Sequence, residues 1–458
     1  MPVDNIVPVI LAAGKGTRMH SDKPKVLQNV LRRPMLAYVY DALDKTFAAP
    51  AVTVVGFGAD QVRAAFPERA ELFALQEEQL GTGHALQVAW DAARKCGAEY
   101  CAVINGDTPL VTPDSMRLLA EAAGRSDVAF MTIAPNDPAS FGRVVRDENS
   151  EISAIVEAKD YDISVHGPVT GEVNAGIYLF RFDAVEPLLQ KLSNDNMGGE
   201  YYITDLIGFA VNEGLRVKGV QCGNDTNLMG INSPLELVKA EQQLRRSIVE
   251  NLLGSGVLIH NPDTVIIGPD VDVQPGAEIF GHCEIYGKSV VEKGCVMGSY
   301  TMVRDSIFRS GAELREFSHI EKAEVGPGCV VGPYARLRPG ARLEKDAKVG
   351  NFVEVKKAVL GEGAKASHLS YIGDAEVGAH CNIGAGTITC NYDGKNKHKT
   401  VIDEGAFIGS NTAIVAPCTI GRGALVGAGS TVTKDVPEDQ TAVARAKQVN
   451  IPRRSNRS

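Results

Sequence analysis

The sequence lacks the features of several protein classes. It has no basic excess: 47 Lys and Arg stand against 56 Asp and Glu, for a formal charge of −9. Nucleic-acid binders need a basic surface, so this balance argues against that class and leaves room only for a local basic pocket. No apolar run approaches the ~20 residues that cross a bilayer, and the first residues show no signal-peptide pattern. We expect neither a membrane nor a nucleic-acid partner.

Disulfide chemistry is also unexpected. The nine cysteines are odd in number, and none belongs to a C-x-x-C pair. This usage predicts free thiols in a reducing, cytoplasmic compartment. The length of 458 residues suffices for two or three domains, and 44% hydrophobic with 22% charged residues is typical of a globular protein.

The chain changes character near residue 235. Before it, β-rich runs alternate with helical patterns, which predicts a Rossmann-like, mostly parallel α/β sheet covered by helices on both faces. The strands are expected at Ile6–Ala13, Val52–Gly56, Tyr100–Asn105 and Val128–Ala134, and helices at Met35–Phe47 and Gly83–Cys96. A polar helical pattern over Pro234–Leu253 fits a connector or an ordinary surface helix. We predict domains at 1–234 and 256–458 with a helical linker at 235–255.

After Gly256 an aliphatic residue recurs every six positions. The three blocks are Ile267, Val273, Ile279, Ile285, Val291, Met297 and Val303; Val325, Val331, Leu337, Leu343, Val349 and Val355; and Ile402, Ile408, Ile414, Ile420, Val426 and Val432. This period predicts a solenoid with one hexapeptide per face, three faces, ~18 residues per coil and on the order of ten coils. The pattern resembles that of the left-handed parallel β-helix.

Small residues occupy a second slot of the repeat, and cysteines often fill it. Those cysteines are Cys283, Cys295, Cys329, Cys381 and Cys418. We interpret them as small apolar filler rather than as metal or redox groups. Two interruptions are expected, around Arg304–Glu321 and at the polar, basic segment Cys390–Thr400. Loops inserted in a regular scaffold tend to carry function.

A glycine-rich turn follows the first expected strand. The segment Leu11–Met19 (LAAGKGTRM) precedes Lys23-Pro24-Lys25. It is neither a Walker A loop nor the dinucleotide fingerprint. Taken alone, a G-x-G is usually a tight turn, but such a turn also lets backbone N–H groups approach phosphate, and Arg18 and Lys25 add charge. Asp107 ends a β-rich run, where it is either a turn residue or a Mg²⁺ ligand.

These motifs resemble those of the nucleotide-sugar pyrophosphorylases. Later motifs follow in family order: Phe141-Gly142-Arg143, Val156-Glu157, Val173–Gly176, Gly199–Asp205 and Gly230–Asn232. Joined to a hexapeptide domain, they resemble the family of bacterial bifunctional N-acetylglucosamine-1-phosphate uridyltransferases / glucosamine-1-phosphate acetyltransferases over nearly the whole chain. Asn105 departs from the tyrosine that close relatives often carry.

The resemblance implies a uridyltransferase site in the first domain. Lys25 and Arg18 would handle the phosphates of UTP, and Asp107 and Asn232 would hold Mg²⁺. Gly142, Glu157 and Asn174 would line the sugar side. The segments that would contact the nucleotide contain Leu11, Ala12, Ala13, Gly14, Gln76, Gly81, Thr82, Asn105 and Gly106. A sugar 1-phosphate oxygen would attack the α-phosphorus of UTP and release pyrophosphate, a reaction that needs mainly positioning and charge neutralisation.

The resemblance implies an acetyltransferase site in the solenoid. His368 would be the general base for attack of an amine on acetyl-CoA, since neutral imidazole suits this role near pH 7. Ser410 would polarise the thioester carbonyl. Glucosamine 1-phosphate would be bound by Arg338, Lys356, Tyr371, Asn382 and Asn391. Ala385, Ala428 and Arg445 would contact the coenzyme, and Tyr392 would be a further binding residue.

The resemblance also implies a homotrimer, because sites in this fold class lie in grooves between parallel solenoids. The product would be UDP-N-acetylglucosamine, a precursor of peptidoglycan and lipopolysaccharide. Two alternatives stay open. The solenoid could be a non-catalytic scaffold attached to a monofunctional pyrophosphorylase, or both folds could belong to an assembly subunit without catalysis. His368, Lys356 and the inserted loop argue against the first, and the intact Gly14–Met19 segment against the second.

Overall fold

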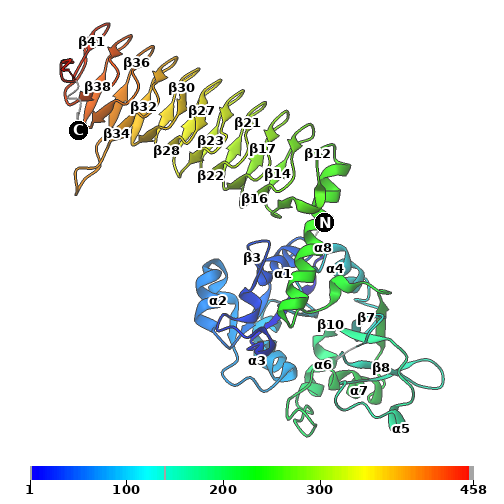
Figure 1. Cartoon of the computed structure of the whole chain (residues 1–458). Helices are drawn as coiled ribbons and strands as arrows, with labels where there is room; N and C mark the ends of the chain where they lie inside the picture. The colour runs from blue at the N-terminus through cyan, green and yellow to red at the C-terminus, as the bar shows by residue number, and fades with distance from the viewer. Residues whose placement is uncertain (1–2, 139–140, 453–458) are drawn as a thin grey trace, which may run out of the picture. The chain divides into compact units, whose positions relative to one another are not determined.

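Packing divides the chain into two units, residues 1–242 and 243–458. The structure, a computed structural model, describes residues 3–138 and 141–452. In the first unit helices alternate with strands, and the second consists of short strands stacked in parallel (Figure 1).

A nine-stranded sheet forms the centre of the first unit. Its main path runs β11-β7-β10-β6-β1-β4-β5. Neighbours on this path are parallel except β10, which runs antiparallel to β6 and β7, and β8 and β9 form an antiparallel extension. The predicted mostly parallel sheet is confirmed. The strands are β1 (Ile6–Ala12), β4 (Val52–Val55), β5 (Phe73–Leu75), β6 (Tyr100–Asn105), β7 (Val128–Ile133), β8 (Arg143–Arg146), β9 (Ile152–Val156), β10 (Val173–Arg181) and β11 (Val217–Gln221).

Helices cover both faces of this sheet, because successive strand residues point to opposite sides. In β1, Ile6 and Ile10 join one apolar core while Val7 and Val9 join the other. The helices are α1 (Met35–Asp44), α2 (Ala59–Ala65), α3 (Thr82–Arg94), α4 (Pro113–Ala120), α5 (Ile163–His166), α6 (Phe182–Leu189) and α7 (Asp205–Asn212), and a small hairpin pairs β2 (Asn29–Val30) with β3 (Arg33–Pro34). Helices α1 and α4 supply the first core, and α3, α6 and α7 the second.

Helix α8 (Pro234–Gly254) contains the division between the units. Its start is capped, since Ser233 Oγ accepts from the Glu236 backbone N–H at 3.3 Å. Near the middle, Glu241 accepts from the Leu31 N–H of the first unit at 2.8 Å, whereas Val249 and Leu252 pack into the solenoid core. No helix among the described residues has the length and apolarity needed to cross a bilayer.

The second unit is a three-sheet parallel β-helix, as the six-residue period predicts. Its sheets hold 11, 10 and 9 short strands, and every pair is parallel. All the aliphatic residues of the period are buried. Four neighbouring strands of the first sheet are β24 (Val330–Val331), β27 (Lys348–Asn351), β30 (Lys365–His368) and β33 (Asn382–Ile383). The matching strands of the second sheet are β25 (Arg336–Leu337), β28 (Glu354–Lys356), β31 (Tyr371–Gly373) and β34 (Ile388–Cys390).

The expected interruption around Arg304–Glu321 is wrong. The solenoid continues there through β20 (Ile307–Phe308), β21 (Glu313–Leu314) and β22 (His319–Glu321), with Phe308, Leu314 and Ile320 fully buried. The spacing between buried residues falls from six to five here, because the corner between the second and third sheets is one residue shorter in these coils. Asp305 and Lys322 make the shorter corner in the left-handed conformation, at φ 48° and 45°.

The second interruption is a true insertion at the same corner. Between β34 and β35 (Thr400–Ile402) the chain leaves the solenoid and forms a small hairpin in which Tyr392 pairs with Lys397. The five repeat cysteines are buried and every cysteine is a free thiol, in line with the filler interpretation. Burial raises the pKa of Cys329 to about 11, which makes its thiol inert near neutrality.

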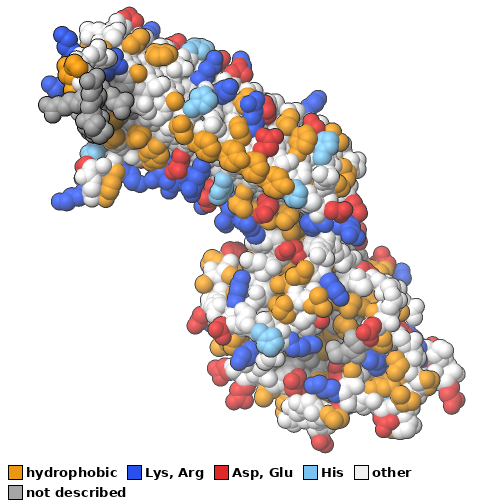
Figure 2. Space-filling model, in the orientation of Figure 1, with side chains coloured by type: hydrophobic (Ala, Val, Ile, Leu, Met, Phe, Trp, Pro, Cys, Tyr) orange, Lys and Arg blue, Asp and Glu red, His pale blue; other side chains and the backbone are white. Residues whose placement is uncertain are grey.

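An aromatic ladder follows the corner between the first and second sheets. It consists of His282, Tyr300, Phe317, Tyr334 and Phe352, one per coil, with ring centroids 4.6 to 5.3 Å apart. About half of each of the last four side chains is exposed, and Leu369 continues the file one coil further. Figure 2 shows hydrophobic side chains gathered in a band along the visible face of the solenoid.

Candidate functional sites

The glycine-rich turn after β1 forms one wall of a pocket of about 400 Å³ in the first unit. No described residue accepts a hydrogen bond from the backbone N–H of Gly14, Lys15 or Gly16, and all three residues line the pocket. Gly16 adopts φ 64°, and a Cβ there would lie 2.7 Å from Lys25 Cβ. The turn therefore needs glycine, and it offers three amides to an anion.

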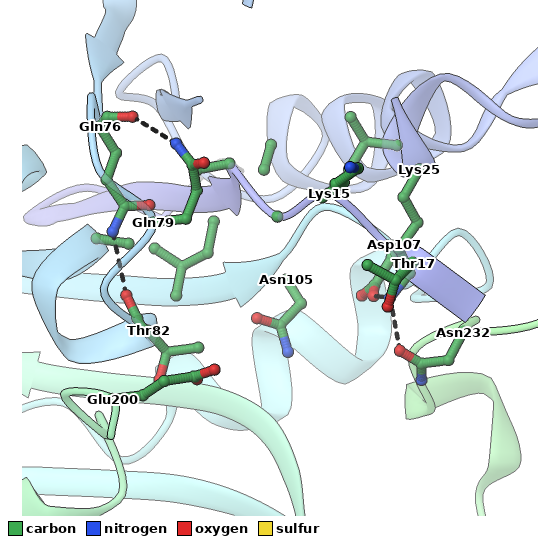
Figure 3. Close-up of a pocket in the computed structure, with 18 of the residues that line it drawn as sticks. Lys15, Thr17, Lys25, Gln76, Gln79, Thr82, Asn105, Asp107, Glu200 and Asn232 are labelled. Carbon is green, nitrogen blue, oxygen red and sulfur yellow. Dashed lines mark hydrogen bonds and ion pairs between the residues drawn. The ribbon is translucent and has the colours of Figure 1, made fainter. Parts of the chain in front are cut away.

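Lys25, Asp107 and Asn232 meet at one end of this pocket (Figure 3). Lys25 Nζ pairs with Asp107 Oδ2 and donates to Asn232 Oδ1 at 2.6 Å. Asp107 follows β6, and Asn232 directly precedes the cap of α8, where Glu236 accepts from the Asn232 backbone N–H at 2.6 Å. The Ile231 N–H donates to the Asp107 carbonyl at 2.9 Å, which fixes the two segments together.

These oxygens fit the predicted Mg²⁺ site. Asp107 Oδ1 is buried without a hydrogen-bond partner, so the carboxylate keeps an unused acceptor. Asp107 Oδ2 and Asn232 Oδ1 both face the single cationic Nζ of Lys25, which shows that they converge on one point. Mg²⁺ takes oxygen ligands, few of them carboxylates, and completes its shell with water and phosphate oxygens.

The opposite end of the pocket holds the segment predicted to contact the base (Figure 3). Gln76 is buried, and its Nε2 donates to the Gly81 carbonyl at 3.2 Å. Thr82 opens α3, and its Oγ1 accepts from the Ile203 N–H at 3.1 Å. Asn105 lies between the two ends. Arg18 lines the same pocket with an exposed side chain.

The predicted sugar residues form a group of their own and do not line this pocket. The Asn174 N–H donates to the Gly142 carbonyl at 2.9 Å, and a Cβ on Gly142 would lie 3.5 Å from Glu157 Oε1. Asn174 Oδ1 accepts from the Gly176 N–H at 3.0 Å, and Gly176 in turn lies against Asn105. Gly176 therefore connects this group of residues to Asn105, which lines the pocket.

Carboxylates crowd this sugar side. Burial raises the pKa of Glu157, against a hydrogen bond from Thr204 Oγ1 at 3.0 Å that lowers it. Burial and then the charge of Asp160 raise the pKa of Asp205 to about 6. Sequence reasoning missed seven of the pocket residues: Lys15, Gly16, Thr17, Val26, Gln79, Ala85 and Glu200. Lys15, Gly16, Thr17 and Glu200 belong to the quoted motifs, whereas Gln79 had no signal.

In the solenoid, the predicted phosphate-binding residues share the second sheet. Val355 and Ile372 point inward, so by alternation Lys356 and Tyr371 point outward. The hydroxyl of Tyr371 lies over Gly373, two residues further along the chain. Gly373 pairs with Lys356 of the previous coil in the strand register. Arg338 lies one coil further back and donates to Glu354 Oε1 at 2.8 Å. This face carries two of the expected cations.

The inserted hairpin brings a third cation that the sequence did not indicate. The side chain of Lys397 lies against that of Lys356, and the two like charges lower the pKa of Lys397. Asn391 anchors the hairpin by donating to Asp374 Oδ2. Asp393 stiffens its tip by accepting from the Lys395 and Asn396 N–H groups at 2.8 and 2.7 Å. Tyr392 is exposed, and its hydroxyl donates to the Gly394 carbonyl at 2.7 Å.

His368 lies at the corner on the other side of this face. It ends β30, its side chain is exposed, and its Nδ1 is 2.7 Å from Asn351 Oδ1. The face between His368 and the lysine pair is about three residues wide, or roughly 10 Å at ~3.3 Å per residue. That width suits a sugar phosphate with an amine at one end.

The predicted coenzyme residues continue along the same corner. The Asn411 N–H donates to the Ala385 carbonyl at 2.7 Å, the Gly429 N–H to the Ser410 carbonyl at 2.8 Å, and Arg445 to the Ala428 carbonyl. These bonds join successive coils. The residues therefore form a row along the corner, one residue per coil, which starts beside His368. With strands about 4.8 Å apart, four coils span on the order of 20 Å. Asn382 lies in β33, one coil beyond β30.

Known proteins match this chain over nearly its whole length. The MobA-like NTP transferase domain matches residues 8–162, and the bacterial transferase hexapeptide family (six repeats) matches residues 399–434. "Bifunctional protein GlmU" of Nitratidesulfovibrio vulgaris (strain DSM 19637 / Miyazaki F) is 58% identical over 98% of both chains. The chain belongs to the GlmU family. The GlmU protein of Oleidesulfovibrio alaskensis is 59% identical over 97% of this chain and 96% of its own.

More distant GlmU proteins match equally fully. That of Lawsonia intracellularis is 44% identical over 97% of both chains. Among solved structures, the inositol-1-phosphate CTP transferase from T. maritima is 19% identical over 51% of this chain and 93% of that chain, with a TM-score of 0.40, a likeness too weak to add to the assignment.

GlmU membership confirms the resemblance found in the sequence and its reading as a bifunctional enzyme. The chain joins a nucleotidyltransferase domain to a hexapeptide acyltransferase domain, and its partners are small-molecule substrates. The alternatives of a scaffold solenoid and of a non-catalytic subunit are therefore set aside.

Proposed function

We propose that this GlmU-family enzyme makes UDP-N-acetylglucosamine in two steps, one in each unit. The solenoid transfers acetyl from acetyl-CoA to glucosamine 1-phosphate, and the α/β domain then transfers uridylyl from UTP to N-acetylglucosamine 1-phosphate. The observation that carries the proposal is that each unit holds its own cluster of cations beside groups suited to one of these reactions. We assign the uridylyl transfer to residues 1–234, the acetyl transfer to residues 256–458, and the helical linker to residues 235–255.

In the acetyl transfer, the phosphate binds at Lys356, Lys397 and Arg338, which offer charge-assisted hydrogen bonds. The amine is then directed across the face toward His368. Its nitrogen attacks the thioester carbon, His368 Nε2 takes the amine proton, and the C–S bond breaks with CoA as leaving group. Ser410 polarises the carbonyl, and Asn382, Asn391 and Tyr371 orient the sugar. The row Ala385, Ser410, Ala428 and Arg445 supports an extended coenzyme along the corner.

In the uridylyl transfer, the amides of Gly14–Gly16 with Arg18 and Lys25 hold the triphosphate, while Gln76, Gly81 and Thr82 hold the nucleoside. Gly142, Glu157 and Asn174 orient the sugar so that its 1-phosphate oxygen attacks the α-phosphorus and pyrophosphate leaves. Mg²⁺ at Asp107 and Asn232 supplies charge neutralisation on the phosphates when bound.

We also propose that the enzyme is a cytoplasmic homotrimer. Its product, UDP-N-acetylglucosamine, would serve the synthesis of peptidoglycan and lipopolysaccharide. The aromatic ladder supports the trimer, since it leaves a stripe of half-exposed rings on the corner that ends at His368. A second copy laid along this corner would bury the stripe and close the acetyl site.

Two assays on the full chain test the proposal. Acetyl-CoA with glucosamine 1-phosphate should release free CoA thiol, and UTP with N-acetylglucosamine 1-phosphate should release pyrophosphate. The variant K356A should lose only the first reaction and K25A only the second. A wild-type chain that releases pyrophosphate but no thiol would contradict the assignment of the solenoid.

A further inference from the structure

Asn351 and His368 occupy the same position in neighbouring coils. They are the last residues of β27 and β30, and the strand register places them side by side. Asn351 Oδ1 lies 2.7 Å from His368 Nδ1. Among the described residues, Asn351 is the only side chain that hydrogen-bonds the imidazole ring.

This contact decides which ring nitrogen carries the proton. An amide oxygen can only accept a hydrogen bond, so Nδ1 must be the protonated nitrogen and Nε2 must hold the lone pair. We propose that Asn351 is a positioning residue for the acetyl transfer: it holds His368 in the tautomer and orientation in which Nε2 accepts the proton of the amine. The inference rests on the proposed role of His368 as base and adds the residue that prepares it.

The backbone around the pair keeps the two coils in close contact. A Cβ on Gly350 would lie 2.0 Å from the Ser367 carbonyl oxygen, so only glycine lets the chain pass there. The Leu369 N–H donates to the Asn351 carbonyl at 3.0 Å, and Ser370 Oγ donates to the His368 carbonyl at 2.9 Å. The amide oxygen of Asn351 is therefore presented to Nδ1 by a fixed backbone rather than by a mobile loop.

The strands that flank His368 carry ionisable groups but none that could replace Asn351. They are Lys348 on β27, Lys365 on β30, Tyr371 on β31, and Glu354 and Lys356 on β28. In the part of the chain that the structure describes, none of them forms a hydrogen bond or ion pair with the ring. Asn351 is neutral, so it selects the tautomer without adding a charge that would hold His368 protonated.

Acetyl-transfer kinetics of the full chain test the inference. N351A and the shape-matched N351L should lower kcat by about 10- to 100-fold, less than loss of the base itself, with KM for both substrates within about twofold of wild type. N351D keeps an acceptor and should retain much of the activity, while its carboxylate favours the imidazolium and moves the acid limb of the pH–rate profile to higher pH. Q274A is the control, because Gln274 Oε1 also links two coils, to the Lys293 N–H at 3.2 Å, far from His368 in the chain.

A double-mutant cycle with H368A separates positioning from stability. If Asn351 acts through His368, N351A should cost nothing further in the H368A background. Full activity of N351A and N351L, or losses that multiply with that of H368A, would overturn the inference. An H368A protein with full acetyl transfer would instead overturn the proposed base, so the two failures are distinguishable. Unchanged uridylyl transfer and thermal unfolding in each variant confirm that the fold is intact.

Discussion

Lys25 forms an ion pair with one oxygen of Asp107 while the other oxygen of the same carboxylate, Oδ1, is buried without a hydrogen-bond partner. One oxygen of the carboxylate is thus paired with the protein's own cation, and the other oxygen remains free to accept a hydrogen bond or to bind a metal ion. Such an oxygen is costly unless a ligand uses it, which supports a cation site at this point. The side chain of the same lysine lies against Gly16, and the glycine-rich turn lines the same pocket, so the residues suited to phosphate and to metal share one small region.

The first prediction concerns this carboxylate. D107N removes the charged ligand and should lower uridylyl transfer by at least about 100-fold, because charge neutralisation supplies most of the catalysis in phosphoryl transfer. Acetyl transfer should remain within about twofold, since its residues belong to the other unit. D114N is the control, a change at an exposed aspartate that forms an ion pair with Arg117 one turn along α4. Equal loss of both activities in folded D107N protein would refute the separation of the two sites.

The second prediction tests the register of the solenoid. Val331 is fully buried, whereas its neighbour Val330 in the same strand points outward. V331D would place an unpaired charge in the narrow interior, at a cost of several kcal/mol. We expect V331D to lower the melting temperature of the solenoid and its acetyl transfer together, and V330D to leave both nearly unchanged. Circular dichroism melts with acetyl-transfer assays decide between them, and a stable, active V331D protein would show that the side chain can face solvent.

The six-residue period predicts the interior of the solenoid but not its corners. Every residue of the period is buried, because the flat faces repeat exactly where the sequence repeats. The rhythm slips near Asp305 and Lys322, where a left-handed residue makes a corner one residue shorter, and sequence alone shows this as an interruption. The antiparallel strand β10 was also not expected, since its apolar run is buried on both faces and resembles a parallel strand.

The sites show a similar limit. Motifs predict Lys25, Asp107 and His368, because their residue types and neighbours are specific. Lys397 and Asn351 were not predicted to act, because their roles depend on which coil or hairpin folds against them. The contact of Lys397 with Lys356 is made by a loop that leaves the repeat, and the contact of Asn351 with His368 by coils that lie side by side only in the fold.

The third prediction concerns pH and the crowded carboxylates of the first unit. Burial, followed by the charge of Asp160, raises the pKa of Asp205 from 3.8 to about 6, so the native state holds this proton more tightly than the unfolded state. The stability that this group contributes is fully present below about pH 4 and is lost as pH rises through 6. D205N does not titrate and should therefore melt at a higher temperature than wild type at pH 7, with the difference fading toward pH 4.

Thermal melts from pH 4 to pH 8 check the prediction for Asp205. D195N, at an exposed aspartate, serves as the control and should follow the wild type throughout. A D205N protein whose gain in melting temperature does not depend on pH would show that the effect comes from packing rather than from the charge.

The fourth prediction concerns the pair of lysines in the acetyl site. Lys397 and Lys356 repel each other, as the lowered pKa of Lys397 indicates. A bound phosphate offsets this repulsion, so the pair favours the liganded state over the free one. K397Q should raise KM for glucosamine 1-phosphate by about 10-fold or more, the scale of one charge-assisted hydrogen bond. Because the repulsion disappears, the same variant should melt no lower than wild type.

K395Q is the control for this prediction and should keep the wild-type KM. Lys395 lies on the same hairpin, and its backbone N–H donates to Asp393. Steady-state kinetics at constant ionic strength, with salt titrated separately, check the prediction, since screening should weaken the wild-type advantage. If K397Q lowered kcat at an unchanged KM, Lys397 would act on the transition state rather than on phosphate binding, and the face between His368 and the lysine pair would need a different ligand orientation.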